Sequence, residues 1–400
     1  MYRENDWRPD GYVTRPKEFW SLDPTVAYLN HGAFGACPLP VLERQQYWRS
    51  QLERNPLGFF VRELEPLWDD ARRQLAAFVG APSDELAFVP NATTGVNAVL
   101  RSLSFKTGDE LLTTNQEYNA CRNALNFVAE RAGARVVVAP VPFPIESPSQ
   151  AIEIVMQHVS SRTRLALLDH ITSKTALIFP IAQLVSQLAA KNVDTLVDGA
   201  HAPGQIPLNL QEIGAAYYTA NCHKWLSAPK GAAFLYVRRD KQAEIRPLTI
   251  SHGANSSRKD RSRFHLEFDW TGTGDPTAYL CVPEAIAFLG QLLPGGWAEL
   301  MEHNHAKVLE GRRLLCETLD IPVPSPDEMI GSMASLPLPN GCTDKLYEIL
   351  CDEFRIEVPI DYSSTPPLMR ISAAPYNTVA DYERLAAALK ILRDRGYLGG

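Results

Sequence analysis

The stretch that decides the fold is YTANCHKWL, residues 218–226. Its first residues have the character of a buried strand, and Lys224 stands just past them, between His223 and Trp225. A lysine in such a place loses much of its water and is harder to keep charged. The position of Lys224 therefore indicates that its amine takes part in a reaction. The strand before it is expected to belong to a sheet whose edge carries this reactive site.

The predicted sheet has seven strands. From about residue 85, short β-rich runs alternate with longer runs whose apolar residues recur at helical spacing, which is typical of a mainly parallel sheet with helices on its faces. The strands are expected at 85–89, 110–114, 135–140, 164–169, 194–198, 215–220 and 232–237, and the helices between them at 93–103, 118–133, 149–159 and 182–192. Too little chain separates the last two strands for a crossover helix, so this pair is expected to be antiparallel.

Beyond about residue 280 the pattern changes. It predicts long helices at 278–293 and 298–319, short strands near 332–338, 355–361 and 368–373, and a final helix at 379–396. The sequence thus predicts an α/β protein with a large domain, 26–275, and a smaller α+β domain, 276–400, which the N-terminal segment 1–25 joins. A length of 400 residues fits two domains, each with its own core.

Composition narrows the function classes. Hydrophobic residues make up 45% and charged residues 21% of the chain, as in an ordinary globular enzyme, and a net charge of −7 argues against nucleic acid or acidic membranes as main partners. The densest basic group, RKDRSR at 258–263, is expected to be a solvated loop. No run approaches the ~20 apolar residues of a membrane span, and MYRENDWRPDGY at 1–12 has no apolar core of a secretory signal.

The cysteines and histidines give no metal pattern. Seven cysteines, an odd number, show no CxxC pair, and the nine histidines lack HxxEH-like spacing. We expect reduced thiols, a cytoplasmic protein and no metal site.

Polar residues follow several strands at their carboxyl ends, where ligands bind in open α/β sheets. The segment FVPNATTGVN, 88–97, runs from a strand into a helix whose start offers N–H groups to a phosphate. An ordinary helix N-cap by Asn91, Thr93 or Thr94 explains it equally well. Asp198 ends the strand of DTLVDGAH, with His201 three residues on; an Asx turn is the alternative for this aspartate.

An acid, a lysine and a phosphate cradle on one sheet edge point to pyridoxal phosphate. A lysine can form a Schiff base with this cofactor, and an aspartate facing the pyridine nitrogen makes the ring a better electron sink. The carbanion left after removal of the substrate's Cα proton is thereby stabilised.

Motifs along nearly the whole chain resemble the class V aminotransferase family of fold-type I pyridoxal-phosphate enzymes, and within it the isopenicillin N epimerase-like branch. They are YLNHGAFGACP (28–38), FVPNATTGVN (88–97), TTNQEYNA (113–120), LDHITSKTALIFPI (168–181), VDGAHAPG (197–204), NCHKWLSAPKG (221–231), WTGTGDP (270–276) and MRISAAPYNT (369–378). The resemblance implies the aspartate aminotransferase-like fold of pyridoxal-phosphate transferases.

The resemblance also implies roles for single residues. Lys224 would hold the cofactor and act as acid and base at Cα, Asp198 would pair with the pyridine nitrogen, and His201 would bind the cofactor's 3-oxygen. The residues implied in phosphate binding are Ala92, Thr93, Asn221 and His223, and Thr273 would reach the phosphate of the neighbouring subunit of a homodimer.

Three further positions carry alternatives. Tyr118 would lie over the cofactor ring, although its residue type alone favours a packed aromatic at a helix start. Arg370 would grip the substrate carboxylate, a bidentate task that suits a guanidinium, against a structural salt bridge. Asn30 and His31 would line the substrate pocket, and a buried, satisfied histidine is an equal alternative for His31.

The reaction is less determined than the cofactor. The branch favours epimerisation of an amino acid or short peptide through a Lys224 Schiff base and a quinonoid; the second proton could come from Lys224 itself, His31 or Tyr118. Alternatives are a C–S (β) lyase on a cysteine conjugate or sulfoxide, and an aminotransferase. A cysteine desulfurase is disfavoured, since residues 356–370 before Arg370 contain no cysteine. A non-catalytic regulator is weak, because Lys224, Asp198 and Arg370 are all present.

Overall fold

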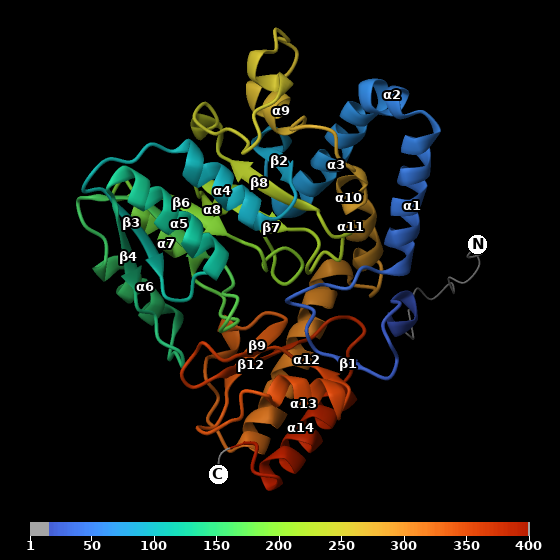
Figure 1. The fold of residues 1–400 in the computed structure, drawn as a ribbon, viewed down its shortest axis with the longest axis vertical. Helices are drawn as coiled ribbons and strands as arrows, with labels where there is room; N and C mark the ends of the chain where they lie inside the picture. Colours follow the sequence, from blue (N-terminus) through green and yellow to red (C-terminus); the bar gives the residue numbers. More distant parts are fainter. Residues whose placement is uncertain (1–15, 399–400) are drawn as a thin grey trace.

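The computed structural model describes residues 16–398. The prediction about residues 1–12 therefore lies outside the described part of the chain. Its main feature is a sheet of seven strands in the order β2-β8-β7-β6-β5-β3-β4 (Figure 1). The strands are β2 (Leu86–Val89), β3 (Glu110–Thr114), β4 (Arg135–Ala139), β5 (Thr163–Asp169), β6 (Asp194–Asp198), β7 (Tyr217–Asn221) and β8 (Ala233–Val237).

The predicted seven strands and their mainly parallel arrangement are confirmed. β7 and β8 pair antiparallel as expected, and β8 is also antiparallel to β2. The remaining four pairings, which join β4, β3, β5, β6 and β7, are parallel. The sixth predicted segment, 215–220, is wrong by a small shift: β7 runs from Tyr217 to Asn221.

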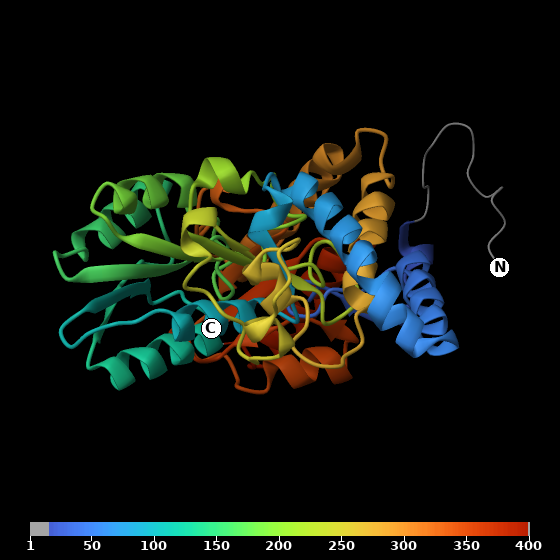
Figure 2. The same cartoon turned by 90° about the horizontal axis from the view of Figure 1, so that it is seen from above.

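Alternating side chains of the strands belong to two apolar cores, one on each face of the sheet. Leu111 and Leu167 face the core under α4 (Ala92–Ser102) and α5 (Asn119–Ala132). Leu112 and Leu168 face the core under α6 (Pro148–Gln157), α7 (Ile181–Ala189) and α8 (Leu210–Ile213). Figure 2 shows the strands between these helices.

The chain before β2 is largely helical, which the sequence analysis did not predict. It contains η1 (Pro16–Phe19), α1 (Leu39–Arg54), α2 (Pro56–Gly58), the π-helical η2 (Phe59–Glu63), α3 (Leu64–Val79) and η3 (Ser83–Glu85), besides the two-residue strand β1 (Ala27–Tyr28). Between β8 and residue 276 lie η4 (Arg239–Lys241), η5 (His252–Asn255) and α9 (Arg263–Phe268).

The C-terminal part is α+β, as predicted, but two of its predicted elements are split. The helix expected at 278–293 is α10 (Thr277–Leu280) and α11 (Val282–Gly290), interrupted before Pro283, which cannot donate a backbone hydrogen bond. The strand expected at 355–361 is two short strands, β10 (Ile356–Glu357) and β11 (Ile360–Asp361), which belong to different sheets. The other elements are α12 (Gly296–Leu319), η6 (Asp327–Met329), β9 (Met333–Pro337), α13 (Leu346–Asp352), β12 (Leu368–Ser372) and α14 (Val379–Asp394).

The beginning of the described chain lies against its end. β1 pairs with β10, and β12 is the central strand of the small sheet β11-β12-β9 (Figure 1). α11 packs on α1 and α3, whereas α12 packs on α14 and β9. The domain boundary at 275/276 stays a prediction.

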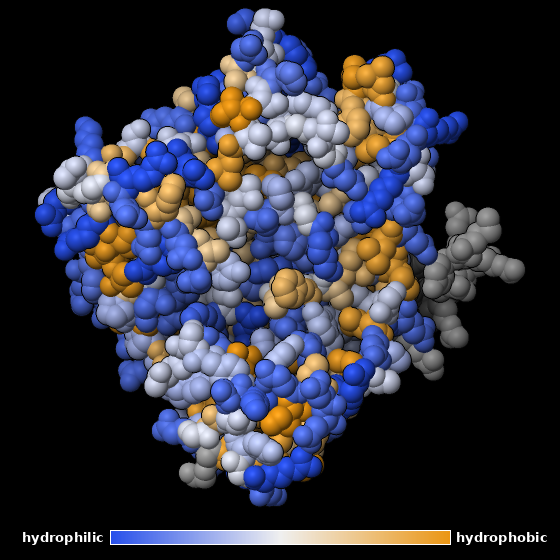
Figure 3. All heavy atoms as spheres, viewed as in Figure 1, coloured by the Kyte–Doolittle hydropathy of each residue, from blue (hydrophilic) through white to orange (hydrophobic). Residues whose placement is uncertain are grey.

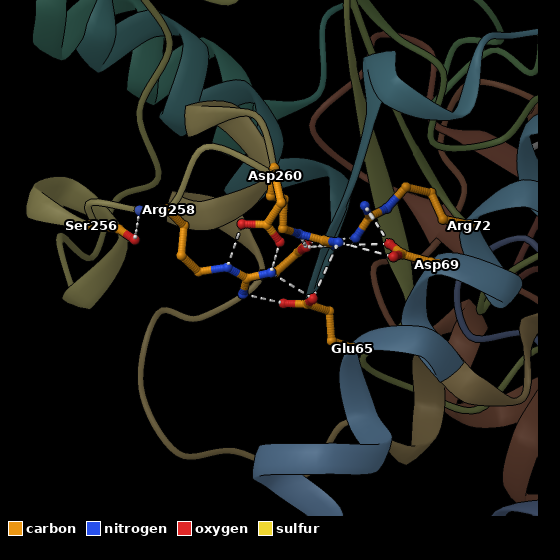
Figure 4. A network of polar contacts seen from close by, with 8 residues as sticks. Glu65, Asp69, Arg72, Ser256, Arg258 and Asp260 are labelled. Atoms are coloured by element: carbon orange, nitrogen blue, oxygen red, sulfur yellow. Dashed lines mark hydrogen bonds and ion pairs between the residues drawn. The ribbon is translucent and has the colours of Figure 1, made fainter.

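The segment RKDRSR is not a simple solvated loop, so this expectation is corrected in part. The guanidinium of Arg258 bonds Glu65 of α3 at 2.7 and 2.9 Å and also contacts Asp260. Arg261, whose side chain is only 9% exposed, bonds Asp69 and Asp269. Figure 4 shows Arg258 beside Glu65 and Asp260. We call Glu65, Asp69, Arg72, Arg258, Asp260, Arg261 and Asp269 the α3 ion network. It fastens the loop before α9 to α3.

The surface in Figure 3 is mostly hydrophilic, with apolar side chains in small separate groups. One of these groups lies where Figure 1 places α2, and the exposed apolar side chains at that turn include Leu57 and Val61. Among residues 16–398, no helix combines the length and the apolar character needed to cross a membrane.

Candidate active site

Most of the predicted site residues line one cavity. It has a volume of about 270 Å³ and lies at the carboxyl ends of β5, β6 and β7, where the start of α4 and the small sheet meet it. The predicted residues on its wall are Ala92, Thr93, Tyr118, Asp198, His201, Asn221, His223, Lys224 and Arg370. A larger cavity of about 510 Å³ is lined by no lysine, arginine, histidine or cysteine, so the smaller one has the chemistry.

Lys224 is buried in this cavity. Burial, followed by the charge of Arg370, lowers the pKa of its amine to about 8, while Asp198 acts in the opposite direction. The amine is therefore partly neutral near physiological pH, which a lysine needs in order to act as a nucleophile or base. This answers why the sequence places a lysine just past a buried strand.

Close backbone approach holds the segment of Lys224 in place. The carbonyl oxygens of Lys224 and His223 lie 2.5 and 3.0 Å from where a Cβ on Gly35 would stand, so no larger residue fits at position 35 without a shift. In the same way, a Cβ on Gly95 of α4 would meet Thr219 of β7 at 2.1 Å. The two glycines let the amino-terminal loop and α4 close around the lysine.

His201 lies directly beside the lysine. Its Nε2 is 3.0 Å from Nζ of Lys224, and its Nδ1 accepts a hydrogen bond of 3.4 Å from the indole N–H of Trp225. Burial is the first cause that keeps its pKa well below the usual range, and Lys224 and Arg370 add to it. His201 is thus neutral, with its proton on Nε2, and can donate to an oxygen in the cavity.

Asp198 is 3% exposed at the end of β6. Each of its oxygens accepts one hydrogen bond: Oδ1 from the backbone N–H of Ala200 at 2.9 Å, and Oδ2 from the thiol of Cys121 at 3.1 Å. Burial raises the pKa of the carboxyl group, while these donors and Lys224 act against that rise.

Two further carboxyl groups, which the sequence analysis missed, lie beside Asp198. Asp169 ends β5 and stands opposite Asp198 in the strand register. Glu117 lies in the loop before α5, and its side chain, with those of Cys121 and Asp198, brings three possible metal-ligand atoms within 4.8 Å of one another. Asp169 could have been predicted, because it is a carboxylate at the end of a strand, the same signal that identified Asp198. Glu117 and Cys121 carry no such signal, since their inward positions depend on the tertiary structure.

The expected phosphate end lies at the start of α4. Asn91 is the N-cap residue and accepts from Thr94 N–H at 2.8 Å, so the ordinary cap is present, made by Asn91. Asn221 accepts from Ala92 N–H at 2.9 Å and so ties β7 to the helix start. Because His223 donates from Nδ1 to the carbonyl of Ala232, its neutral ring offers only a lone pair at Nε2.

Arg370 reaches into the cavity from β12. Its guanidinium donates to the carbonyl oxygen of Ser173, and its Nε has no hydrogen-bond partner among the described residues. Burial lowers the pKa of Arg370 to about 10, and Asp361 opposes this. No carboxylate lies within ion-pair distance of Arg370 in the described chain, so the guanidinium is free to bind an anion.

His31 and Asn30, like Thr273, are predicted site residues that do not lie on the wall of this cavity. His31 is buried, donates from Nε2 to the carbonyl of Lys224 at 3.0 Å, and accepts at Nδ1 from the hydroxyl of Tyr376 at 2.7 Å. This is the alternative interpretation, a satisfied buried histidine. The adjacent Gly32, Ala33 and Phe34 line the cavity instead.

The amino-terminal loop, residues 29–35, rests on the last part of the chain. Leu29 N–H donates to Glu357 O at 2.9 Å, and Gly32 N–H donates to Ser372 Oγ at 3.2 Å. Asn377 Nδ2 donates to Tyr28 O at 2.9 Å.

Tyr118 and Thr273 occupy exposed places. Tyr118 is 46% exposed at the cavity wall, which rules out the alternative of an aromatic packed in the core. Thr273 lines the larger cavity and not the one that Lys224 lines. Its predicted reach to a neighbouring subunit stays a prediction.

The residues present fit pyridoxal phosphate. The cavity holds a buried amine of lowered pKa, an aspartate with a satisfied carboxylate, a neutral histidine donor and a capped helix start. When bound, this cofactor supplies an electron sink for Cα chemistry.

Comparison with known proteins agrees with this fit. The family model described as aminotransferase class-V matches residues 28–385. Isopenicillin N epimerase of Amycolatopsis lactamdurans is 36% identical, over 94% of this chain and 97% of its own. Putative L-cysteine desulfhydrase 1 of Oryza sativa subsp. japonica is 32% identical, over 95% of this chain and 86% of its own. A mutant of the protein C-DES with glycine linked to its pyridoxal-phosphate cofactor is 22% identical and has the same fold, with a TM-score of 0.77 over 91% of this chain and 96% of that one.

Proposed function

The chain belongs to the aminotransferase class-V family, whose members include pyridoxal-phosphate-dependent epimerases and C–S lyases, and we propose that it epimerises an amino acid or short peptide with a free α-amino group and carboxylate. The observation that carries this proposal is that Lys224, Tyr118 and Arg370 line the same cavity. Arg370 binds the carboxylate, and Lys224 removes the Cα proton.

Epimerisation also needs a proton donor for the opposite face of Cα. His31 is a poor donor, because both of its ring nitrogens are bonded and it lies off the cavity wall. The hydroxyl of Tyr118 has no hydrogen-bond partner among the described residues and lies at the wall that Lys224 also lines. We therefore assign Tyr118 as the second donor within this proposal.

A C–S lyase is the second candidate, because a desulfhydrase relative covers most of the chain. Elimination needs Lys224 but no donor on the opposite face. A persulfide-forming desulfurase is disfavoured, since the segment before Arg370 has no cysteine and Cys351, on α13, bonds Glu357. The homodimer, the cytoplasmic location and the reach of Thr273 belong to the same proposal; free cysteines at all seven positions support a reducing compartment.

The test is proton NMR in deuterated water with a panel of amino acids, short peptides and cysteine conjugates, together with chiral chromatography and a pyruvate assay. The proposal expects deuterium at Cα and both epimers, and it expects Tyr118→Phe to keep deuterium exchange at Cα of one epimer while it loses inversion. Pyruvate release that survives in Tyr118→Phe would establish the lyase instead.

A further inference from the structure

Three buried carboxyl groups meet beside the cavity: Asp169 and Asp198 line its wall, and Glu117 lies behind them, close to Asp198. Glu117, Asp169 and Asp198 are 5%, 3% and 3% exposed. Among the described residues, no lysine or arginine lies within ion-pair distance of any of them. Because like charges in a low-dielectric interior disfavour one another, all three cannot be ionised together.

The hydrogen bonds show which group holds the charge. Asp198 alone has a donor on each carboxylate oxygen, Ala200 N–H on Oδ1 and the Cys121 thiol on Oδ2. Oε1 of Glu117 and Oδ2 of Asp169 have no partner within the described chain. Donors stabilise an anion, and a buried anionic oxygen without a donor is costly.

The neighbours of the cluster agree with this assignment. Burial is the first cause that raises the pKa of Glu117 and of Asp169 well above the usual range, and the charge of Asp198 raises both further. Burial and the same carboxylates raise the pKa of the Cys121 thiol, so it keeps the proton that it donates. The other titratable groups that face Asp198 are Tyr218 of β7 and Lys224.

We propose that Cys121 is a positioning residue for the cofactor: its thiol fixes Asp198 as the single anion of the cluster, while Glu117 and Asp169 remain neutral acids. The inference rests on the role proposed for Asp198. One anion then faces one protonated ring nitrogen. A second anion would raise the proton affinity of Asp198 and draw the proton away from the ring.

The first experiment needs no bound cofactor. The S–H stretch is measured by infrared spectroscopy in the apoprotein of the wild type, Cys121→Ala and Cys281→Ala. Cys281 is the matched control, because it is equally buried and lies outside the site. A thiol that donates to a carboxylate absorbs at a lower frequency than a free thiol, and a shorter hydrogen bond lowers the frequency more. Cys121 donates to Asp198 at 3.1 Å, whereas Cys351 lies 3.6 Å from Glu357, so Cys121→Ala removes the lowest-frequency band and Cys281→Ala does not. Loss of an ordinary thiol band in Cys121→Ala would overturn the proposal.

The second experiment uses the holoenzyme with cofactor labelled with ¹⁵N in the ring. In Cys121→Ala the ¹⁵N shift is expected to move towards unprotonated pyridine, and the cofactor's Kd is expected to rise about tenfold for the lost hydrogen bond to a charged group. Cys121→Ser keeps a donor, so both values stay near the wild type; it also covers the case in which the alanine variant does not fold.

Glu117→Gln tests the neutral acids. It replaces a neutral acid with a neutral amide of the same shape, so the ¹⁵N shift and the Kd should stay within about twofold of the wild type. A large change would show that Glu117 is ionised and would contradict the proposal. If the wild type takes up no cofactor, the proposed function fails, while the infrared result still decides the role of Cys121.

Discussion

Two acidic regions of this molecule differ in whether cationic side chains neutralise their negative charge. In the α3 ion network, Asp269 and Asp69 are each bonded by both Arg72 and Arg261. At the cavity, Glu117, Asp169 and Asp198 have no cation within ion-pair distance among the described residues. The first region is complete within the chain and serves stability. The second has no counter-charge among the described residues, and in the proposed function the cationic ring nitrogen of the cofactor would supply it.

The largest effect that this comparison predicts is at Lys224. Lys224→Ala removes the buried amine of the cavity and should abolish the visible absorption band of the lysine-linked cofactor and lower turnover at least about 10³-fold. The unfolding midpoint of the apoprotein should not fall, because a buried amine of lowered pKa does not stabilise the fold. Absorbance spectra, turnover assays and thermal unfolding check this. A variant that keeps the band would contradict the proposal that the cavity serves cofactor binding.

The network should show the reverse pattern. Arg261→Met leaves Asp69 and Asp269 without one of their cations and should lower the free energy of unfolding by about 3–5 kcal/mol, with the cofactor band retained at low temperature. Denaturant unfolding measures it, with Lys259→Met, an exposed position in the same loop, as the control. Equal losses in the two variants would show that the ion pairs of Arg261 contribute nothing to the free energy of unfolding beyond what an exposed lysine of the same loop contributes.

The pH dependence of cofactor loading follows from the pKa of Lys224, which is about 8. In the proposed function the amine would attach the cofactor only when it is neutral, and the neutral fraction rises as pH rises towards that pKa. Loading of the apoprotein should therefore be about 50-fold faster at pH 8 than at pH 6. Stopped-flow absorbance tests this, and a rate that is flat over this range would place the pKa of Lys224 well below 8 or make another step limiting.

The smallest effect lies at the exposed edge of the network. Arg258 and Glu65 have side chains that are 42% and 44% exposed, and solvent screens such pairs. Arg258→Met should leave the denaturant midpoint of unfolding close to that of the wild type and well above that of Arg261→Met. A loss as large as that of Arg261→Met would mean that the difference in burial between Arg258 and Arg261 does not determine how much each contributes to stability.

Sequence reasoning found the residues that a strand end or a motif marks. Asp198 ends β6, His201 and Lys224 stand shortly after the ends of β6 and β7, and the structure brings all three to one cavity. It did not find Glu117 and Cys121, because no local pattern shows that their side chains turn towards β6. It also mistook Arg261 for a solvated residue, because its partner Asp69 lies 192 residues away in sequence. The two-strand division of residues 355–361 was hidden for the same reason, since each half pairs with a different sheet.

The hydrogen bonds of residues 27–32 to Arg355, Glu357 and Ser372 have a consequence for biosynthesis. A ribosome makes the amino-terminal loop first and its supports last, so the loop cannot take its final position until nearly the whole chain has emerged. The lysine segment that this loop closes over through Gly35 is therefore also completed late. Cofactor loading becomes a step that follows translation, and ribosome-bound chains that stop short of residue 372 should not capture pyridoxal phosphate.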